Sequence, residues 1–444
     1  MSRLSHSKRL LGISIAAGLV FVTACSSSSS SSSKSGSSTT AAPTTTVAGS
    51  TATTVAVSTS VSGSVTTPTS APAGSVPAGT DTATSAPAGT GVPAVGGVAE
   101  AEALVAAAMK PITFAPPAGV GPIDFTKVKG KTVAIINLAK AVPILTQWEA
   151  EMTTALTGSG IKLTSVDGKF DPNEWGRGIE SAIADKADLI FLLGVPPTAV
   201  KPQIAEAKAA GIPIMASLQG EAGTSLTAVP DLAADVGFDY KVPGKLLADW
   251  FVADSKGKGK ALIFSSDDNT SSPFVWGAMK AEIDRLCPHD CSYTIKDTTV
   301  PEWSDGTLQQ RTKALLQADP SITHILAVYD GMTLAIEPAL VELGVDSKVR
   351  VAGFNGTPAV VANVQGKTAV KMDVGNPNMW FSAGADDAIL KTLTGGKPIQ
   401  DPGVKFRIFT ADNVTGIDTT KEDDVNWFGL DPLTGYRTLW GLKG

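Results

Sequence analysis

From Lys131 onward, short apolar runs alternate with longer runs in which apolar residues recur at helical spacing. Thr132–Leu138 is apolar and partly β-branched, which is typical of a buried strand, and Ala139–Val142 forms a short loop. Pro143 then opens a segment whose apolar residues share one face of a helix. Such units build open α/β sheets, in which ligands bind beyond the carboxyl ends of the strands.

The alternation restarts after Asp239, so the pattern predicts two similar α/β halves. The expected strands are Val133–Leu138, Lys162–Val166, Leu189–Leu193, Ile212–Ala216, Ala261–Phe264, Tyr293–Lys296, Ile325–Tyr329 and Val349–Phe354. The expected helices are Pro143–Thr157, Glu174–Asp185, Ala199–Ala210, Pro273–Leu286, Thr307–Ala318, Met332–Leu343 and Pro358–Val364.

Several helices are expected to begin with Pro after a capping residue, at Ser272-Pro273, Thr357-Pro358 and Asn376-Pro377. Asp330 is expected to be the N-cap of the helix that follows it. These starts come after the carboxyl ends of strands, so their free N–H groups face the edge where ligands bind. One such edge on each half, facing the other, predicts a cleft.

Residues 1–24 have the composition of an export signal. Arg3, Lys8 and Arg9 form a positive start, and the apolar run 10–22 leads into Val-Thr-Ala-Cys, which ends at Cys25. That run is shorter than the ~20 residues that span a bilayer, which favours cleavage over a permanent membrane helix. The last four residues resemble a bacterial lipobox, which implies lipidation of Cys25; an ordinary cleaved signal is the alternative.

Residues 25–98 are dominated by Ser, Thr, Ala, Pro, Gly and Val, with Lys34 and Asp81 as isolated charges. Such a segment buries too little apolar surface to order itself, so it predicts a disordered linker; a glycosylated stalk is the alternative. Residues 99–130 contain one possible short helix, Ala101–Met109, followed by several prolines. We expect this stretch to be an arm that wraps the folded body.

The formal net charge is −6 and becomes −9 once the three cations of the signal are removed. This balance argues against nucleic acid or an anionic membrane surface as the main partner. The three His residues, His6, His289 and His324, suggest no Ser-His-Asp triad and no paired-His site. We therefore expect no enzymatic activity, no cofactor and no metal.

Motifs in a fixed order resemble the type I periplasmic binding protein superfamily, and within it the ribose-like solute-binding lipoproteins of bacterial ABC importers. They comprise Val133–Leu138 with Pro143, Asp171-Pro172, Ala210-Gly211-Ile212-Pro213-Ile214, Asp330-Gly331-Met332 and Val351-Ala352-Gly353-Phe354-Asn355-Gly356-Thr357-Pro358. The resemblance spans about Lys131 to Ile408. It implies two Rossmann-like three-layer α/β lobes joined by a three-segment hinge, which close around a solute.

The resemblance also implies how the chain is divided. Crossovers are expected near Phe238–Asp239, near Gly375–Asn376 and near Gly403. The N-terminal lobe would then comprise 131–238 plus 376–402, and the C-terminal lobe 239–375 plus 403–444. The aromatic residues of the tail 415–444 indicate that it packs back onto the body.

The expected binding edge departs from that of sugar-binding relatives. They carry an aromatic pair after the Pro of the first loop, where Ile144 and Leu145 stand here. Neutral residues also replace charged groups that grip sugar hydroxyls: Gln219 in place of part of an Asp-Arg pair, the Trp276 region in place of an Arg, and Asn355 in place of an Asp. A smaller or less polar solute, with an aromatic or aliphatic body, is therefore an alternative to a sugar.

Other candidate ligand residues follow from position. Trp303 falls where the resemblance places a stacking aromatic, and Tyr329 ends a strand at the cleft edge. Core packing is the alternative for Trp303 and for Trp276. Lys140, in the first loop, would pair with an anionic solute or remain solvated. Asn376 would orient a solute or cap a helix.

Cys287 and Cys291 flank His289 in a short loop. Alternating Cys, His and Cys can ligate a metal, but no fourth ligand is suggested and an exported protein keeps its cysteines oxidised. We therefore expect a small structural disulfide.

These features predict an extracytoplasmic, lipid-anchored monomer that captures a small molecule for a membrane-embedded ABC permease. Two alternatives remain: a ligand receptor that passes its closed form to a membrane signalling protein, and a cell-surface enzyme that has taken up the same fold.

Overall fold

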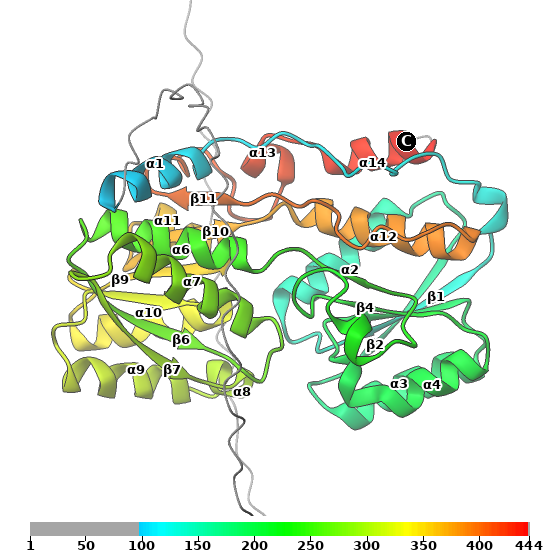
Figure 1. Cartoon of the computed structure of the whole chain (residues 1–444), viewed down its shortest axis with the longest axis horizontal. Helices are drawn as coiled ribbons and strands as arrows, with labels where there is room; N and C mark the ends of the chain where they lie inside the picture. The colour runs from blue at the N-terminus through cyan, green and yellow to red at the C-terminus, as the bar shows by residue number, and fades with distance from the viewer. Residues whose placement is uncertain (1–96, 443–444) are drawn as a thin grey trace, which may run out of the picture. The chain divides into compact units, whose positions relative to one another are not determined.

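The computed structural model describes residues 97–442. The expected signal peptide, the lipidation site Cys25 and the linker up to residue 96 lie outside the described residues. Within the described part, two sheets each carry helices on both faces (Figure 1), which confirms the expected α/β fold class.

The N-terminal lobe is built on a five-stranded parallel sheet with the order β2-β1-β3-β4-β5. Its strands are β1 (Thr132–Asn137), β2 (Lys162–Asp167), β3 (Leu189–Leu193), β4 (Ile214–Ser217) and β5 (Ala234–Val236). The inner strands β1 and β3 are buried along almost their whole length, which explains their continuous apolar sequences. Edge strand β2 has exposed positions and a more polar sequence.

Two layers of helices cover this sheet. On one face α3 (Pro172–Ala184) and α4 (Lys201–Ala209) enclose a core with the even-numbered residues of β1. On the other face α2 (Pro143–Ala155) packs along α12 (Asn378–Thr394), which returns to this lobe from late in the chain. The short elements η2 (Pro197–Val200) and α5 (Ser225–Ala228) complete the lobe.

The C-terminal lobe has a six-stranded sheet with the order β11-β10-β9-β8-β6-β7, in which only β11 is antiparallel to its neighbour. Its strands are β6 (Lys260–Ser265), β7 (Ser292–Asp297), β8 (His324–Ala327), β9 (Arg350–Asn355), β10 (Val370–Gly375) and β11 (Arg407–Thr410). Its helices are α6 (Lys241–Asp254), α7 (Ser272–Leu286), α8 (Val300–Ser304), α9 (Thr307–Ala318), α10 (Asp330–Leu343) and α11 (Pro358–Gln365). Beyond α7, Cys287 and Cys291 are bonded through their sulfurs, with Cα atoms 5.5 Å apart.

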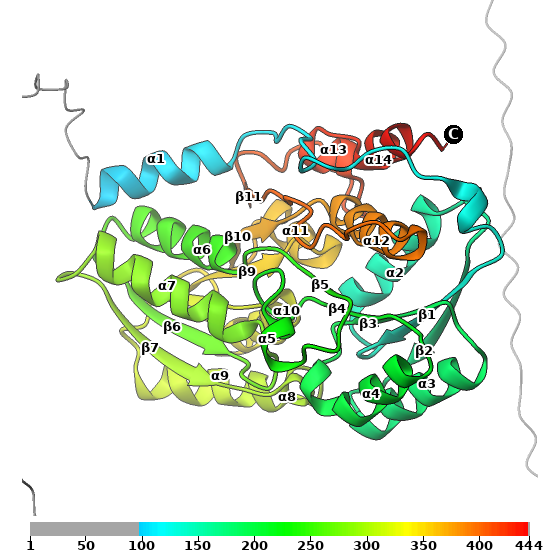
Figure 2. The ribbon, with the colours of Figure 1, turned by 45° about the vertical axis from the view of Figure 1, so that its right-hand side comes forward.

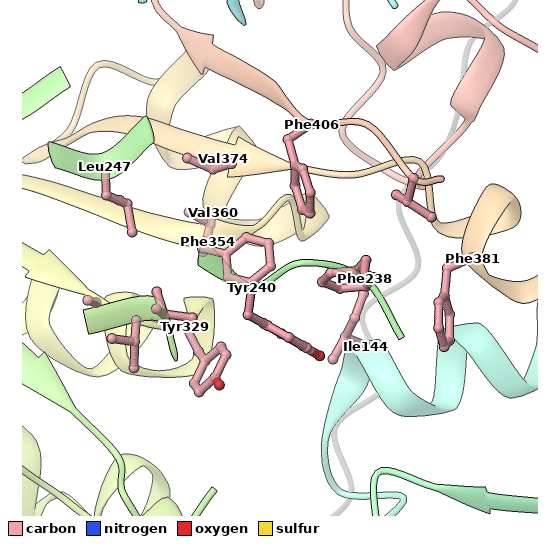
Figure 3. Close-up of a cluster of buried hydrophobic side chains, with 14 of the residues drawn as sticks. Ile144, Phe238, Tyr240, Leu247, Tyr329, Phe354, Val360, Val374, Phe381 and Phe406 are labelled. Atoms are coloured by element: carbon pink, nitrogen blue, oxygen red, sulfur yellow. The ribbon is translucent and has the colours of Figure 1, made fainter. Parts of the chain in front are cut away.

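Aromatic side chains connect the cores of the two lobes. Phe238 follows β5 at the first crossover and lies 5.8 Å from Phe381 of α12 and 5.4 Å from Phe406, between ring centroids. Tyr240 stacks on Phe238 and reaches Phe354 of β9 (Figure 3). One hydrophobic cluster therefore runs from the α2 face of the N-terminal lobe through the crossovers into the C-terminal lobe.

An arm and a tail run along the crossover side of both lobes. The arm begins with α1 (Val98–Ala108), which packs on α6 of the C-terminal lobe, and reaches the N-terminal lobe through η1 (Phe125–Lys127). The tail leaves β11, forms α13 (Asp424–Phe428), and ends in α14 (Pro432–Trp440), which packs on α12. Figures 1 and 2 show the two segments side by side, above the rest of the described chain.

Backbone hydrogen bonds join the arm to the tail. The amide of Ile112 donates to the carbonyl of Phe428 at 3.1 Å, and that of Ile123 donates to the carbonyl of Trp440 at 3.0 Å. Between them Phe114 of the arm packs edge-on against Trp380 and Tyr436. We call residues 97–131 and 411–442 together the strap; they bridge the two lobes in addition to the three expected crossovers.

Some expected helix starts are wrong in detail. Helix α12 begins at Asn378 with Pro377 as N-cap, and the side chain of Asn376 donates to that of Asn378 instead of capping the helix. Helix α10 begins at Asp330, so Tyr329 and not Asp330 is its N-cap. The Asp330 carboxylate instead accepts from the backbone amide of Thr357, at the start of α11.

Candidate functional site

The candidate polar residues lie just beyond the carboxyl ends of strands in both lobes. Gln219 follows β4, Tyr329 follows β8, Asn355 ends β9 and Asn376 follows β10. In open α/β sheets this edge is where ligands bind. The fold therefore places these four residues where the sequence predicts a site.

Gln219 touches the opposite lobe directly. Its Oε1 accepts a hydrogen bond of 2.7 Å from Oγ1 of Thr270, and its Nε2 donates to the carbonyl of Ser217 at 2.9 Å. The next residue is Gly220, with φ of 140°, and a Cβ there would lie 2.6 Å from Cε2 of Phe274. The close approach of the two lobes at this point thus depends on the missing side chain of Gly220.

Ser271 is the centre of a hydroxyl cluster in the C-terminal lobe. Its Oγ lies 2.7 Å from the hydroxyl of Tyr329 and 2.9 Å from Oδ1 of Asn269, and the hydroxyl of Tyr240 lies near it. Burial raises the pKa of both phenols, so both stay protonated near neutral pH. Figure 3 shows the Tyr240 hydroxyl directed toward Ile144 of α2, so this cluster faces the other lobe.

Trp303 packs beside this cluster. Its ring centroid is 5.9 Å from that of Tyr329 at an interplanar angle of 44°, and the indole lies over Gly331, where a Cβ would come within 2.8 Å of it. The side chain is partly exposed, yet its Nε1 is buried and finds no acceptor among residues 97–442. A buried donor without an acceptor is costly, so this indole is suited to an oxygen of a bound molecule.

Two asparagines offer amides at the same edge. Asn355 is 8% exposed and has φ of 152°, in the region that favours glycine. Asn376 is completely buried; its Nδ2 donates to Oδ1 of Asn378 at 3.0 Å, and its own Oδ1 has no donor in the described part of the chain. Two polar atoms at this edge, Nε1 of Trp303 and Oδ1 of Asn376, thus lack a partner.

The candidates of the first loop and of the start of α2 already have contacts within the protein. Nζ of Lys140 forms an ion pair of 3.0 Å with Glu149, whose other oxygen accepts from Asn137. Leu145 is buried in the core next to Gly194. Of the three candidates here, the buried Ile144 faces Tyr240 (Figure 3). A role of Lys140 and Leu145 in ligand binding stays a prediction.

Trp276 lies in α7, the helix that follows β6. Its Nε1 donates to Oδ1 of Asp267 at 2.9 Å, and the ring is partly exposed. Its indole therefore already has an acceptor, which distinguishes it from Trp303.

The sequence analysis missed Tyr240, Thr270 and Ser271. Thr270 and Ser271 belong to a run of Ser, Asp, Asn and Thr, residues 265–272, directly after a buried strand. A run of short polar side chains at the carboxyl end of a strand indicates a possible ligand-binding edge. These residues were missed because the end of the run was interpreted only as the cap of the next helix. Tyr240 stands one residue beyond the expected first crossover. An aromatic residue at that position is readily interpreted as part of the hydrophobic core, so no feature of the sequence places it at the site.

Other parts of the described chain show different features. Two surface hollows of the N-terminal lobe, of about 650 and 570 Å³, include none of the candidate residues; Lys186 and Gly211 line one, and Pro172 and Gln203 the other. Within residues 97–442, no group of three His, Cys, Asp or Glu side chains is arranged to hold a metal ion. Nor does any helix in that range combine the length and apolar character needed to cross a membrane.

Comparisons with known proteins agree with this geometry. A profile of the periplasmic binding protein domain matches residues 133–396. A xylitol-binding protein of Mycolicibacterium smegmatis is 25% identical over 272 residues, which are 61% of this chain and 74% of that protein.

Solved structures show the same fold at lower identity. An ABC transporter solute-binding protein from Agrobacterium vitis with bound allitol has a TM-score of 0.57 at 20% identity, covering 65% of this chain and 98% of the other. One from Bacillus halodurans with bound myo-inositol has a TM-score of 0.56 at 19% identity, covering 65% and 97%. The domain match spans more than half of the sequence and both lobes, and so the chain belongs to the periplasmic binding protein domain family, with the type I, ribose-like fold.

Proposed function

We propose that this protein is the extracytoplasmic solute-binding subunit of an ABC importer, and that it holds a small, uncharged, polyhydroxylated solute, a sugar alcohol or sugar, between its lobes. Cys25 would carry the lipid that anchors it to the outer face of the membrane. The partner would be a membrane permease, to which the closed, solute-loaded monomer delivers its cargo. No catalytic step is part of this function.

The composition of the binding edge is the observation that carries the proposal. Its polar groups are amides and hydroxyls: Gln219, Ser271, Tyr329, Asn355 and Asn376. Neutral donors and acceptors of this kind match hydroxyl groups, and an aromatic face such as that of Trp303 matches the C–H face of a polyol.

The charged groups nearby already have partners. Lys140 is paired with Glu149, and Asp267 accepts from the indole of Trp276. Asp268 accepts from the hydroxyl of Ser266 and the amide of Val300. An ionic solute would therefore meet no uncommitted counter-charge among these residues, and burying its charge would be unfavourable.

The relatives point to the same class of solute. One is named for xylitol, and solved structures of the same fold hold allitol and myo-inositol. All three are uncharged polyols.

The test is a binding screen on the full-length protein purified in detergent. Isothermal titration calorimetry and thermal shift would cover xylitol, allitol, myo-inositol, pyranose sugars, amino acids and aromatic acids. Solute at a hundred times its Kd should stabilise the protein by about 2.7 kcal/mol. Xylonate is the matched control for xylitol, because it has a similar length and adds a charge; it should bind much more weakly. Binding of an amino acid or aromatic acid, with no response to any polyol or sugar, would contradict the proposal.

A further inference from the structure

Two buried carboxyl groups lie directly beneath the candidate binding edge. Asp330 is 2% exposed and follows Tyr329, and Asp373 is completely buried in β10, three residues before Asn376. Both lie against β9: Asp373 pairs with Gly353 in the sheet register, and Oδ1 of Asp330 is 2.9 Å from where a Cβ of residue 353 would be. The Asp330 carboxyl therefore occupies, together with the Thr333 hydroxyl, the space that the missing side chain of Gly353 leaves, and Asp373 stands beside Gly353 on the neighbouring strand.

Asp330 ties two of the binding loops together. Its Oδ2 accepts from the backbone amide of Thr357 at 2.7 Å and from the Thr357 hydroxyl at 2.6 Å. Thr357 stands two residues after Asn355, and Asp330 stands one residue after Tyr329. The loop that presents Asn355 is thus fixed to the loop that presents Tyr329 through one carboxylate oxygen.

Asp373 connects the loop that presents Asn376 to the other two loops. Its carboxyl lies close to that of Asp330, beside Gly353, and the backbone amides of Gly356 and Val374 are near enough to attract it. No donor in the described chain meets Oδ1 of Asp330 or either oxygen of Asp373 with good hydrogen-bond geometry. Two carboxylates are both acceptors, so this contact requires a proton on one of them.

Among residues 97–442, no cation is paired with either acid. Lys371, two residues before Asp373 on the same strand, donates to the carbonyls of Lys367 and Thr368. Arg407, on neighbouring β11, donates to the carbonyls of Met109 and Trp427. Burial raises the pKa of both Asp330 and Asp373, and for Asp373 the negative charge of Asp330 raises it further.

We propose that Asp330 and Asp373 share a single proton and act as a positioning pair, which holds the loops of Tyr329, Asn355 and Asn376 in the arrangement that binds solute. This proposal rests on the solute-binding function proposed above. Neither acid touches the solute. When the proton is lost, two adjacent buried negative charges repel, the three loops separate, and binding weakens as the pH rises.

The binding test compares full-length wild-type protein with Asp373→Asn, using xylitol as the probe from about pH 6 to about pH 9. The Asn side chain donates a permanent N–H to Asp330, so the variant should bind with a nearly constant Kd. The wild-type Kd should rise by about tenfold over the same range, since one unit of pKa difference between two states corresponds to a factor of ten. Asp386→Asn is the matched control: Asp386 is an equally buried carboxyl without a hydrogen-bond partner in the described part of the chain, but it lies on α12. It should keep the wild-type pH profile.

A readout without solute separates this proposal from the proposed function. The infrared carbonyl stretch of a protonated carboxyl should be present in wild-type protein at neutral pH, and the wild-type minus Asp373→Asn difference spectrum should contain it. If polyols fail to bind but this band is found, the solute is wrong and the shared proton stands. If the band is absent from the difference spectrum, or if Asp373→Asn keeps the wild-type pH profile of binding, the positioning pair is overturned. Should Asp373→Asn fail to fold, Thr357→Val provides a second test: it removes the 2.6 Å bond to Asp330 and should weaken binding several-fold, whereas an unchanged Kd would overturn the proposal.

Discussion

Trp440 donates its indole N–H to Oδ1 of Asp387 at 2.9 Å, which fixes the end of the tail to α12. The other oxygen of Asp387 lies 2.8 Å from Nζ of Lys391, so this buried carboxylate has two partners. Trp440 itself is only 1% exposed. The tail is therefore part of the hydrophobic core of the N-terminal lobe.

Replacing Trp440 by Ala should strongly destabilise the protein. The substitution leaves a large cavity and removes the donor to a buried carboxylate, so we expect a loss of about 3–5 kcal/mol in the free energy of unfolding. Urea unfolding of the full-length protein measures it. Trp440→Phe keeps most of the packing and should cost less than half as much. A loss below about 1 kcal/mol for Trp440→Ala would mean that the tail is only loosely attached.

Trp303→Ala should weaken solute binding without unfolding the protein. The indole is partly exposed and offers both a ring face and an N–H that has no acceptor in the described chain. Stacking and one hydrogen bond each contribute about 1 kcal/mol, so the Kd for the bound polyol should rise at least tenfold. Titration calorimetry measures the change, with Trp276→Phe as control because the Trp276 indole is already bonded to Asp267. If Trp303→Ala instead lowers the melting temperature sharply, Trp303 is a core residue.

Gly220→Ala should disturb the contact between the lobes. The residue has φ of 140°, and an added Cβ would lie 2.6 Å from the ring of Phe274, so we expect a loss of about 1–3 kcal/mol. Gly277→Ala, in α7, is the matched control because a Cβ there meets nothing within 4 Å. It should stabilise the protein by about 0.5–1 kcal/mol. Melting temperatures that change in the same direction would refute the steric reading of Gly220.

Stability should fall as the pH rises from about 5.5 to about 8. Burial and the charge of Glu282 raise the pKa of Asp249 to about 7, and burial raises that of Glu151 to about 7. Burial, with the charge of Glu151, also raises the pKa of Glu422 and Asp424 of the tail. The folded chain thus holds more protons than the unfolded chain between about pH 4, where free carboxyls titrate, and these raised values. The stabilisation is complete below this window and is lost as the pH rises through it.

Thermal melts across that range measure the effect. Asp249→Asn removes one of the titrating groups, so its melting temperature should depend less steeply on pH than that of the wild type. A wild-type melting temperature that rises steadily between about pH 5.5 and about pH 8 would contradict the expected sign.

The strands and helices of the body could be predicted because burial and local pattern agree there. The strand Leu189–Leu193 and the helix Thr307–Ala318 occur with the expected bounds. Each is flanked by polar or turn residues, and its apolar residues follow a single pattern, a continuous run in the strand and helical spacing in the helix. Ile212–Ala216 begins two residues late, at Ile214, because Pro213 cannot donate to the ladder. The last strands, β10 and β11, are missing from the expected set. Strand β11 has only four residues, which is too short to show a period. In β10, Val370, Met372 and Val374 do alternate with polar or small residues, so this strand could have been predicted.

The contacts of the site depend on side chains far apart in sequence. No local signal shows that Asp330 accepts from Thr357, the N-cap residue of a helix that begins 28 residues later, instead of capping its own helix. Likewise, the 2.7 Å bond between Gln219 and Thr270 exists only once both lobes are in place. The sheet edge at which these residues lie could be predicted from the α/β pattern. Their hydrogen-bond partners could be identified only in the structure.

The strap changes how long a captured solute would be held. With it, the described chain passes between the lobes five times, where the sequence led us to expect three passages. The arm and tail are bonded to one another at Ile112 and at Ile123, so neither can slide without breaking backbone hydrogen bonds. Any opening of the lobes must bend or shear this second, hydrogen-bonded layer along with the hinge. The strap would therefore influence the dwell time of a solute as well as its affinity.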